Sequence, residues 1–178
     1  FSKAVIGLSG GIDSSLTAAI AVDAIGKQNV IGISMPSAFS SEHSKKDAAS
    51  LAENLGIKFE TIPINNIFTE LLGEMDSFFS GTESGLAEEN LQARIRGNIL
   101  MSIANKINAL VLNTGNKTEL ALGYCTMYGD MCGALGVISD LNKKEVYQIS
   151  EWINDSRKDP AIPKNSIEKE PSAELKEN

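Results

Sequence analysis

Leu8-Ser9-Gly10-Gly11-Ile12-Asp13-Ser14-Ser15 closes an apolar run at residues 4–8 and opens an alanine-rich run without Gly or Pro at residues 12–25. This order predicts a strand, a tight turn and the start of a helix. The two glycines let the backbone turn sharply and approach a ligand closely. Because the first N–H groups of a helix have no partner within the helix, they favour an anion in front of them. The stretch therefore predicts a phosphate-binding turn.

Asp13 places a negative charge inside this turn, where it would repel a phosphate unless a divalent cation lay between the two. Mg²⁺ is the cation that proteins usually hold between carboxylates and phosphate oxygens, so Asp13 is a predicted magnesium ligand. The turn lacks both the Gly-x-x-x-x-Gly-Lys pattern of Walker loops and the Gly-x-Gly-x-x-Gly pattern of dinucleotide-binding folds. A purely structural Gly-Gly turn, capped by Asp13 and Ser14, is the alternative.

The composition limits the classes of function. A net charge of −7 over 178 residues argues against a nucleic-acid partner, because such partners select a basic surface. Cys125 and Cys132 are too few for a disulfide framework, and reduced thiols in a cytoplasmic protein are the expected state. The sequence shows no signal peptide and no apolar run of transmembrane length, so no membrane partner is expected. The chain begins at Phe1 directly before a strand, which suggests a piece of a longer protein.

Apolar runs and helical periodicities alternate along the chain, which predicts an α/β fold: a doubly wound, parallel five-stranded sheet with helices on both faces. Strands are expected at residues 4–8, 29–35, 57–64, 109–113 and 135–138, and helices at 12–24, up to 55, 65–79, 87–108, 119–123 and 142–153. The domain is expected to occupy residues 1–153. Residues 154–178 carry three prolines without clear periodicity, which indicates an extended tail or an active-site loop of the same domain.

The turn at residues 9–14 resembles the pyrophosphate loop of the N-type ATP pyrophosphatases, which have the adenine nucleotide alpha hydrolase-like fold. Six further segments extend the resemblance: Met-Pro-Ser at 35–37, Ser-Ser-Glu-His-Ser at 40–44, Glu-Asn-Leu-Gln-Ala-Arg-Ile-Arg-Gly at 89–97, Thr-Gly-Asn-Lys-Thr-Glu at 114–119, Gly-Tyr-Cys-Thr-Met-Tyr-Gly-Asp at 123–130 and Lys-Glu-Pro-Ser-Ala-Glu-Leu at 169–175. In this order they are similar to the synthetase domain of the NAD⁺ synthetases, above all the glutamine-dependent, two-domain type. The resemblance covers nearly the whole chain.

The resemblance implies an ATP-dependent amidation of deamido-NAD⁺. ATP adenylates the nicotinate carboxylate and pyrophosphate is released; ammonia then attacks the acyl-adenylate and AMP leaves. Mg²⁺ would offset the charge of a carboxylate and a triphosphate brought together. In the glutamine-dependent type a glutaminase domain supplies the ammonia, and its nucleophilic cysteine with Glu and Lys partners cannot be assembled from this sequence. The resemblance also implies a homodimer built on the helix at residues 90–107.

The resemblance also implies roles for single residues. Asp13 and Lys143 are expected to carry the chemistry, and Asp13 and Glu119 to bind Mg²⁺. From the residues alone, a solvated helix residue remains the alternative for Glu119 and for Lys143. ATP is expected to contact Gly7, Leu8, Ser9, Gly10, Gly11, Ile12, Asp13, Ser14, Ser15, Met35, Thr114, Lys143 and Ser172, and the substrate Asn90, Arg94, Glu119 and Asp130.

The chain also departs from the pattern. Met127 and Ala134 stand where the ammonia-dependent enzymes have a lysine and an aspartate, which favours the glutamine-dependent type and removes two dinucleotide contacts. Arg96 is favoured less than Arg94 as a substrate contact. His43, the only histidine, is expected to be a loop or capping residue. The alternatives are another pyrophosphatase amidotransferase, such as a GMP synthetase domain, and a non-catalytic nucleotide-binding sensor, which would not need two acidic residues at the turn.

Overall fold

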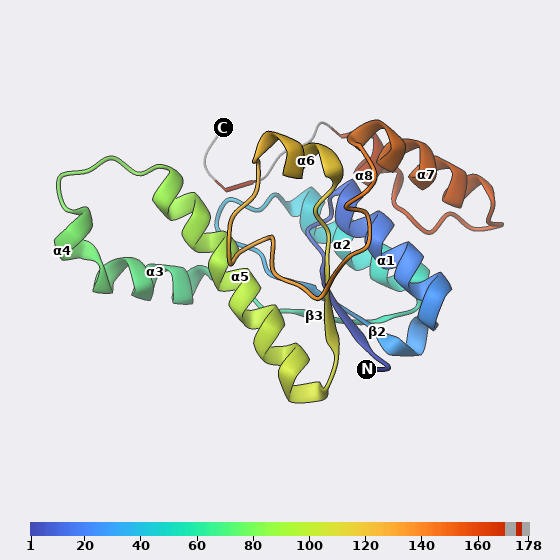
Figure 1. The fold of residues 1–178 in the computed structure, drawn as a ribbon, viewed down its shortest axis with the longest axis horizontal. Coiled ribbons are helices and arrows are strands. Elements are labelled where there is room, and N and C mark those ends of the chain that lie inside the picture. The colour runs from blue at the N-terminus through green and yellow to red at the C-terminus, as the bar shows by residue number, and fades with distance from the viewer. Residues whose placement is uncertain (170–173, 176–178) are drawn as a thin grey trace.

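A single parallel sheet forms the centre of the molecule in the computed structural model, which describes residues 1–169 and 174–175 (Figure 1). Within this part of the chain the strand order is β3-β2-β1-β4-β5, and every neighbouring pair is parallel. The strands are β1 (Ala4–Gly7), β2 (Val30–Ser34), β3 (Lys58–Thr61), β4 (Leu110–Asn113) and β5 (Leu135–Gly136). The predicted five-stranded parallel sheet is thus confirmed.

Helices cover both faces of the sheet, as a doubly wound fold requires. On one face, Ile6 of β1 packs in a core with Leu16, Leu51 and Val146 of three helices. On the other face, Val5 packs with Ile95. Successive strand residues face opposite sides, so one short strand serves both cores. The helices of the first face are α1 (Ile12–Ile25), α2 (Glu42–Leu55), α7 (Lys143–Asp155) and α8 (Lys164–Glu168), and those of the second are α5 (Leu86–Ile107) and α3 (Asn65–Glu74).

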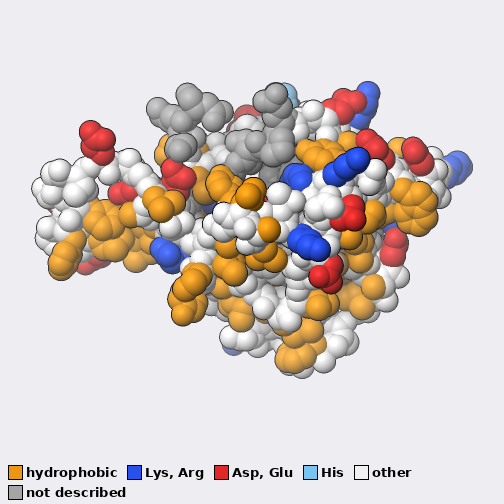
Figure 2. Space-filling view, turned by 45° about the horizontal axis from the view of Figure 1, so that its top comes forward, with side chains coloured by type: hydrophobic (Ala, Val, Ile, Leu, Met, Phe, Trp, Pro, Cys, Tyr) orange, Lys and Arg blue, Asp and Glu red, His pale blue; other side chains and the backbone are white. Residues whose placement is uncertain are grey.

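The segment expected as one helix at residues 65–79 is divided in the structure. The backbone of Met75 (φ −100°, ψ 1°) leaves the helical conformation, so α3 ends at Glu74 and α4 (Asp76–Phe79) follows. Neither helix has a buried residue. Little packing therefore holds the two in one line, and together they form an arm that projects from the body with hydrophobic side chains exposed (Figures 1 and 2). α6 (Lys117–Leu122) and the 3-10 turn at Lys27–Asn29 complete the helical elements of the described residues.

Gly73 offers a test of this weakly packed arm. It lies in the last turn of α3, and a Cβ added there would meet no atom within 4 Å. Gly73→Ala is expected to favour the helix by about 0.5–1 kcal/mol, because alanine loses less backbone entropy. Amide hydrogen exchange across α3 should slow about 2- to 5-fold, while exchange in α7 should not change. Faster exchange in α3 would contradict this prediction.

The chain after α7 differs from the extended tail, which is one of the two alternatives that the sequence indicates for residues 154–178. Ala161 and Ile162 are fully buried in the first core, and α8 follows them. The Asn154 side chain accepts hydrogen bonds from the N–H groups of Ala161 and Ile162 and donates to the Ile162 carbonyl. Asn54 of α2 donates to the Ala161 carbonyl at 3.1 Å. These contacts fold residues 161–169 back onto the domain. Among the described helices, none has the length and apolar character that crossing a membrane requires.

Candidate active site

A cavity of about 490 Å³ opens at the carboxyl edge of the sheet. Its wall includes the residues that follow three strands: Leu8 and Ser9 after β1, Met35 after β2, and Thr114 after β4. The chain winds outward from β1 through β2 to β3 and then returns to the other side of β1 with β4. The cavity thus lies at the point where the strand order reverses, which is where open α/β sheets bind ligands.

The predicted phosphate-binding turn forms one wall of this cavity. Gly11 is the N-cap of α1, and it has no side-chain cap, so the first N–H groups of α1 are available to a ligand. The Ser9 hydroxyl accepts a hydrogen bond from Gly11 N–H at 3.2 Å and lies 3.2 Å from Ser14 Oγ. Most of the residues expected to contact ATP line the cavity: Gly7, Leu8, Ser9, Gly11, Ile12, Asp13, Ser14, Met35, Thr114 and Lys143.

Three of the expected ATP contacts lie elsewhere. Ser15 is fully buried and donates its hydroxyl hydrogen bond to the Gly11 carbonyl at 2.9 Å, so it stabilises the turn from behind. Gly10 is absent from the cavity wall, and its φ of +81° gives the turn its shape. Ser172 lies outside the described residues.

Asp13 and Lys143 meet in the cavity, although 130 positions separate them in the sequence. The Lys143 ammonium forms an ion pair with one oxygen of Asp13, and Asn116 Nδ2 donates to the other at 2.8 Å. Lys143 begins α7, and its N–H donates to Thr118 Oγ1 at 3.0 Å. The starts of α1, α6 and α7 therefore converge at Asp13.

Glu119 lies in the same wall and is fixed by a capping box. Asn116, the N-cap of α6, accepts from Glu119 N–H at 3.0 Å, and Glu119 Oε2 accepts from Asn116 N–H at 3.1 Å. Burial raises the pKa of Glu119, and the negative charges of Asp13 and Asp130 raise it further. The fully buried Asn116 links both expected magnesium ligands; the Asn-x-x-Glu spacing at residues 116–119 is the signal that could have identified it.

The donor set of this pair suits a hard cation. Asp13 and Glu119 are carboxylates at one cavity wall, and Mg²⁺ is typically bound by one or two carboxylates together with phosphate oxygens and water. The described residues contain no group of three or more His, Cys, Asp or Glu side chains that could hold a metal by themselves. Phosphate oxygens and water are the ligands that typically complete the coordination of Mg²⁺ at such a pair.

The two arginines of α5 take different positions. Arg96 lines the cavity, and its Nε donates to the Met35 carbonyl at 2.9 Å. Burial lowers the pKa of Arg96 to about 10, against the opposing effect of the Glu174 charge. Arg94, favoured by the sequence, is exposed, and its Nε donates to the Met127 carbonyl at 3.3 Å. Arg94 is not part of the cavity wall, whereas Arg96 is.

The other expected substrate contacts divide in the same way. Asp130 lines the cavity and accepts a hydrogen bond from Thr126 N–H at 2.7 Å; burial raises its pKa. Asn90 lies outside the wall, and its Oδ1 accepts from the Thr126 hydroxyl at 2.7 Å. Asn90 and Asp130 therefore both bind Thr126, which lies in the loop at residues 123–134 between α6 and β5.

Charged side chains of both signs line the cavity. The acidic residues are Asp13, Glu119, Asp130 and Glu174, and the basic residues are Lys45, Arg96, Lys143 and Lys169. The four basic side chains offset the four carboxylates, so the cavity can receive an anion although the chain has a net charge of −7.

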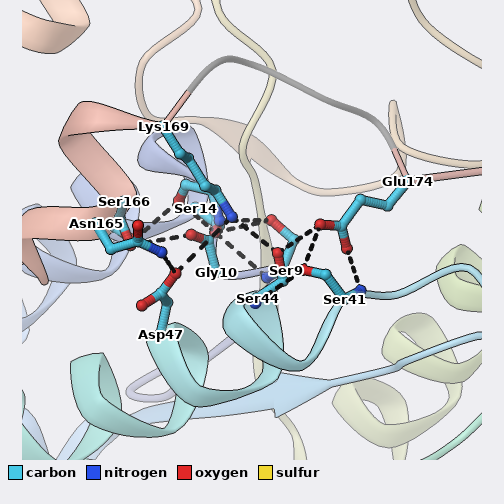
Figure 3. Close-up of polar contacts among 12 residues, drawn as sticks. Ser9, Gly10, Ser14, Ser41, Ser44, Asp47, Asn165, Ser166, Lys169 and Glu174 are labelled. Carbon is cyan, nitrogen blue, oxygen red and sulfur yellow. Dashed lines mark hydrogen bonds and ion pairs between the residues drawn. The ribbon is translucent and has the colours of Figure 1, made fainter. Parts of the chain in front are cut away.

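Glu174 lines the cavity and is bound to the first turn of α2. Its two carboxylate oxygens accept hydrogen bonds from the N–H and hydroxyl of Ser41, at 3.1 and 2.8 Å, and from the Ser44 hydroxyl at 2.7 Å (Figure 3). Burial raises the pKa of Glu174, but these hydrogen bonds outweigh it and hold the pKa below its usual value.

The NAD synthase family model matches residues 1–178, which is the entire chain. The chain belongs to the NAD synthase family. It is 57% identical over 176 residues to a glutamine-dependent NAD(+) synthetase of Synechocystis, a match that covers 99% of this chain and 31% of that protein. The chain thus spans about a third of the length of the curated relatives it matches.

Solved structures of NAD synthase relatives have the same fold. The glutamine-dependent NAD⁺ synthetase of Acinetobacter baumannii, in complex with ADP, superposes with a TM-score of 0.93 at 44% identity, over 94% of this chain and 32% of that one. NMN synthetase of Francisella tularensis superposes with a TM-score of 0.86 at 31% identity, over 98% of this chain and 68% of that one. The resemblance to NAD⁺ synthetases and the adenine nucleotide alpha hydrolase-like fold are confirmed, and a GMP synthetase domain no longer explains the sequence.

Proposed function

We propose that this chain is the ligase part of an NAD⁺ synthetase and converts deamido-NAD⁺ to NAD⁺ with ATP and ammonia. The observation that carries the proposal is the convergence of Asp13, Glu119 and Lys143 on a phosphate-binding turn inside one cavity. A nucleotide-binding sensor would need the turn but not two carboxylates and a lysine around it. The ADP complex of the Acinetobacter relative supports ATP as the nucleotide.

The proposed reaction has two steps. A carboxylate oxygen of the substrate attacks the α-phosphorus of ATP, the bond between that phosphorus and its bridging oxygen breaks, and pyrophosphate leaves with the electron pair. The nitrogen of ammonia then attacks the acyl carbon, and AMP leaves with the electrons of the acyl–oxygen bond while the nitrogen loses a proton. Ammonia is already a nucleophile, so the site mainly has to position the reactants.

The residues of the cavity fit these requirements. Lys143 would stabilise negative charge on the phosphates, and the N–H groups at the start of α1 would donate hydrogen bonds to phosphate oxygens. Asp13 and Glu119 would hold Mg²⁺, which, when bound, neutralises part of the charge on the triphosphate. Arg96 presents a guanidinium to the same cavity and suits the carboxylate of the substrate.

The proposal extends to partners and location. The relatives named glutamine-dependent support a supply of ammonia from glutamine. Exposed apolar side chains on the arm and on α5, namely Ile67, Leu71, Phe78, Leu86 and Met101, support a homodimer. In such a dimer Asn90 and Arg94 would bind deamido-NAD⁺ near the interface. Cys125 and Cys132 are free thiols, which supports a cytoplasmic location. The net charge of −7 argues against a nucleic-acid partner.

The proposed reaction is tested by measuring pyrophosphate and the amidated product from ATP, Mg²⁺ and ammonium with one of three acceptors. The acceptors are deamido-NAD⁺, the deamidated form of NMN, and xanthosine monophosphate. We expect pyrophosphate and NAD⁺ in equal amounts with deamido-NAD⁺ alone. The similarity to the Francisella NMN synthetase makes the mononucleotide the second candidate, and product from it alone would reassign the substrate. ATP binding without pyrophosphate from any acceptor would contradict the proposal and favour a sensor.

A further inference from the structure

Lys169 is a cation of the cavity that the expected site does not include. It is the residue after α8, and its side chain reaches down to the phosphate-binding turn (Figure 3). Nζ donates to Ser44 Oγ at 2.8 Å and lies 3.9 Å from Asp47 Oδ2. Lys169 lines the cavity together with Ser9 and Ser14 of the turn. Its ammonium group therefore faces the space in front of the first helical N–H groups.

The position of this ammonium relative to the turn is fixed by two contacts. The Ser44 backbone packs directly on Gly10, because a Cβ on Gly10 would lie 2.3 Å from the Ser44 carbonyl oxygen. The Ser166 hydroxyl, in α8, donates to the Gly10 carbonyl at 2.9 Å in a buried hydrogen bond. Both the residue that receives the Lys169 ammonium and the helix that precedes Lys169 are thus attached to Gly10.

Asp47 holds the lysine in place from α2. Asp47 is only 8% exposed, and Asn165 Nδ2 donates a hydrogen bond to Asp47 Oδ2 at 2.6 Å. A buried carboxylate of this kind offsets the cost of taking a lysine out of water, and it limits where the ammonium can lie. Lys169 Nζ donates to Ser44 Oγ, and the carboxylates of Asp47 and Glu174 act on the same ammonium. Because an ammonium has three N–H donors, it can also donate to a ligand in the cavity.

We propose that Lys169 binds the phosphates of ATP at this turn and that Asp47 is its positioning residue. The inference rests on the proposed function for the identity of the nucleotide. Two lysines then act on the triphosphate: Lys143, paired with Asp13, and Lys169, paired with Asp47. A cation beside the turn would also stabilise the charge that pyrophosphate gains as it leaves.

The test compares the dissociation constants of ATP, with Mg²⁺, and of adenosine, measured by calorimetry on the same protein. Lys169→Met should raise the dissociation constant of ATP about 10- to 100-fold, as loss of a charge-assisted hydrogen bond does, and leave that of adenosine within about twofold. Lys169→Arg should recover most of the affinity for ATP. Asp47→Asn should weaken ATP binding by a smaller factor, again without changing adenosine binding.

Lys164→Met is the matched control. Lys164 belongs to the same segment, but its side chain is 84% exposed and pairs with Glu168, so ATP binding should not change. Unchanged ATP binding in Lys169→Met, or an equal loss for ATP and adenosine, would overturn the inference. Neither result would contradict the proposed reaction, because that reaction is tested separately by product formation in the unaltered protein. ATP binding that needs Lys169 in a protein without ligase activity would support the inference and contradict the proposed function.

Discussion

Asp13→Asn is expected to lower the rate of pyrophosphate release by about 10³-fold. The substitution keeps the size of the side chain and leaves an oxygen for the hydrogen bond from Asn116. It removes the charge that pairs with Lys143 and that would bind Mg²⁺, and it turns an amide N–H group toward a lysine. Because Asp13 lies at the cavity and outside both hydrophobic cores, the fold should be retained.

The measurement is the rate of pyrophosphate release with ATP, ammonium and deamido-NAD⁺ at several concentrations of Mg²⁺. Asp23→Asn is the matched control, because Asp23 lies on the same helix, is 61% exposed in its side chain, and pairs only at the surface with Arg157. Its rate should equal that of the unaltered protein. If Asp13→Asn kept a rate within tenfold of the unaltered protein, Asp13 could not be the charge on which adenylation depends.

The turn at Asp13 could be predicted because all its signals are local. An apolar strand, two glycines and an alanine-rich run lie within 25 residues, and each indicates its own structure without help from the rest of the chain. The carboxyl-edge position of Glu119 could be predicted for the same reason, since it follows the strand at Leu110–Asn113 and opens a short helix.

The choice between Arg94 and Arg96 could not be made locally. Two residues apart on a helix point in very different directions, so which arginine enters the cavity depends on the face that α5 turns to the sheet. That face is set by Ile95 in the core and by Gly97, where a Cβ would lie 2.8 Å from the Gly129 carbonyl oxygen. Neither contact can be seen in the nine residues around Arg94.

The position of Lys169 at the cavity could not be predicted, because its partners are distant in the sequence. Ser44 lies 125 positions before it, and the hydrogen bond between Ser166 and Gly10 spans 156. Three prolines and mixed charge made the whole tail look extended, whereas Asn54 and Asn154 satisfy its backbone groups and let Ala161 and Ile162 enter the core. Local patterns do not show such side-chain hydrogen bonds.

Gly10→Ala is expected to destabilise the protein by about 3 kcal/mol and to abolish ATP binding. Its φ of +81° costs an L-residue about 1–2 kcal/mol, and the new Cβ would lie 2.3 Å from the Ser44 carbonyl oxygen, in a backbone contact that cannot yield without moving α2. The midpoint of thermal unfolding should fall by about 6–12 °C. Movement of α2 would also displace Ser44, which receives Lys169 and Glu174.

The variant Gly81→Ala separates the two causes of the expected loss of stability, namely the positive φ and the clash of the new Cβ with Ser44. Gly81 has nearly the same φ, +79°, but a Cβ there would meet nothing within 4 Å, so only the conformational cost of about 1 kcal/mol applies. Circular dichroism melting curves of both variants, with ATP affinity measured at 25 °C, therefore give the contribution of the clash as a difference. If the two variants melted together, the contact between Gly10 and Ser44 would not be rigid. The turn could then bind a phosphate without the support of α2, and residues 164–169 would lose their fixed position over it.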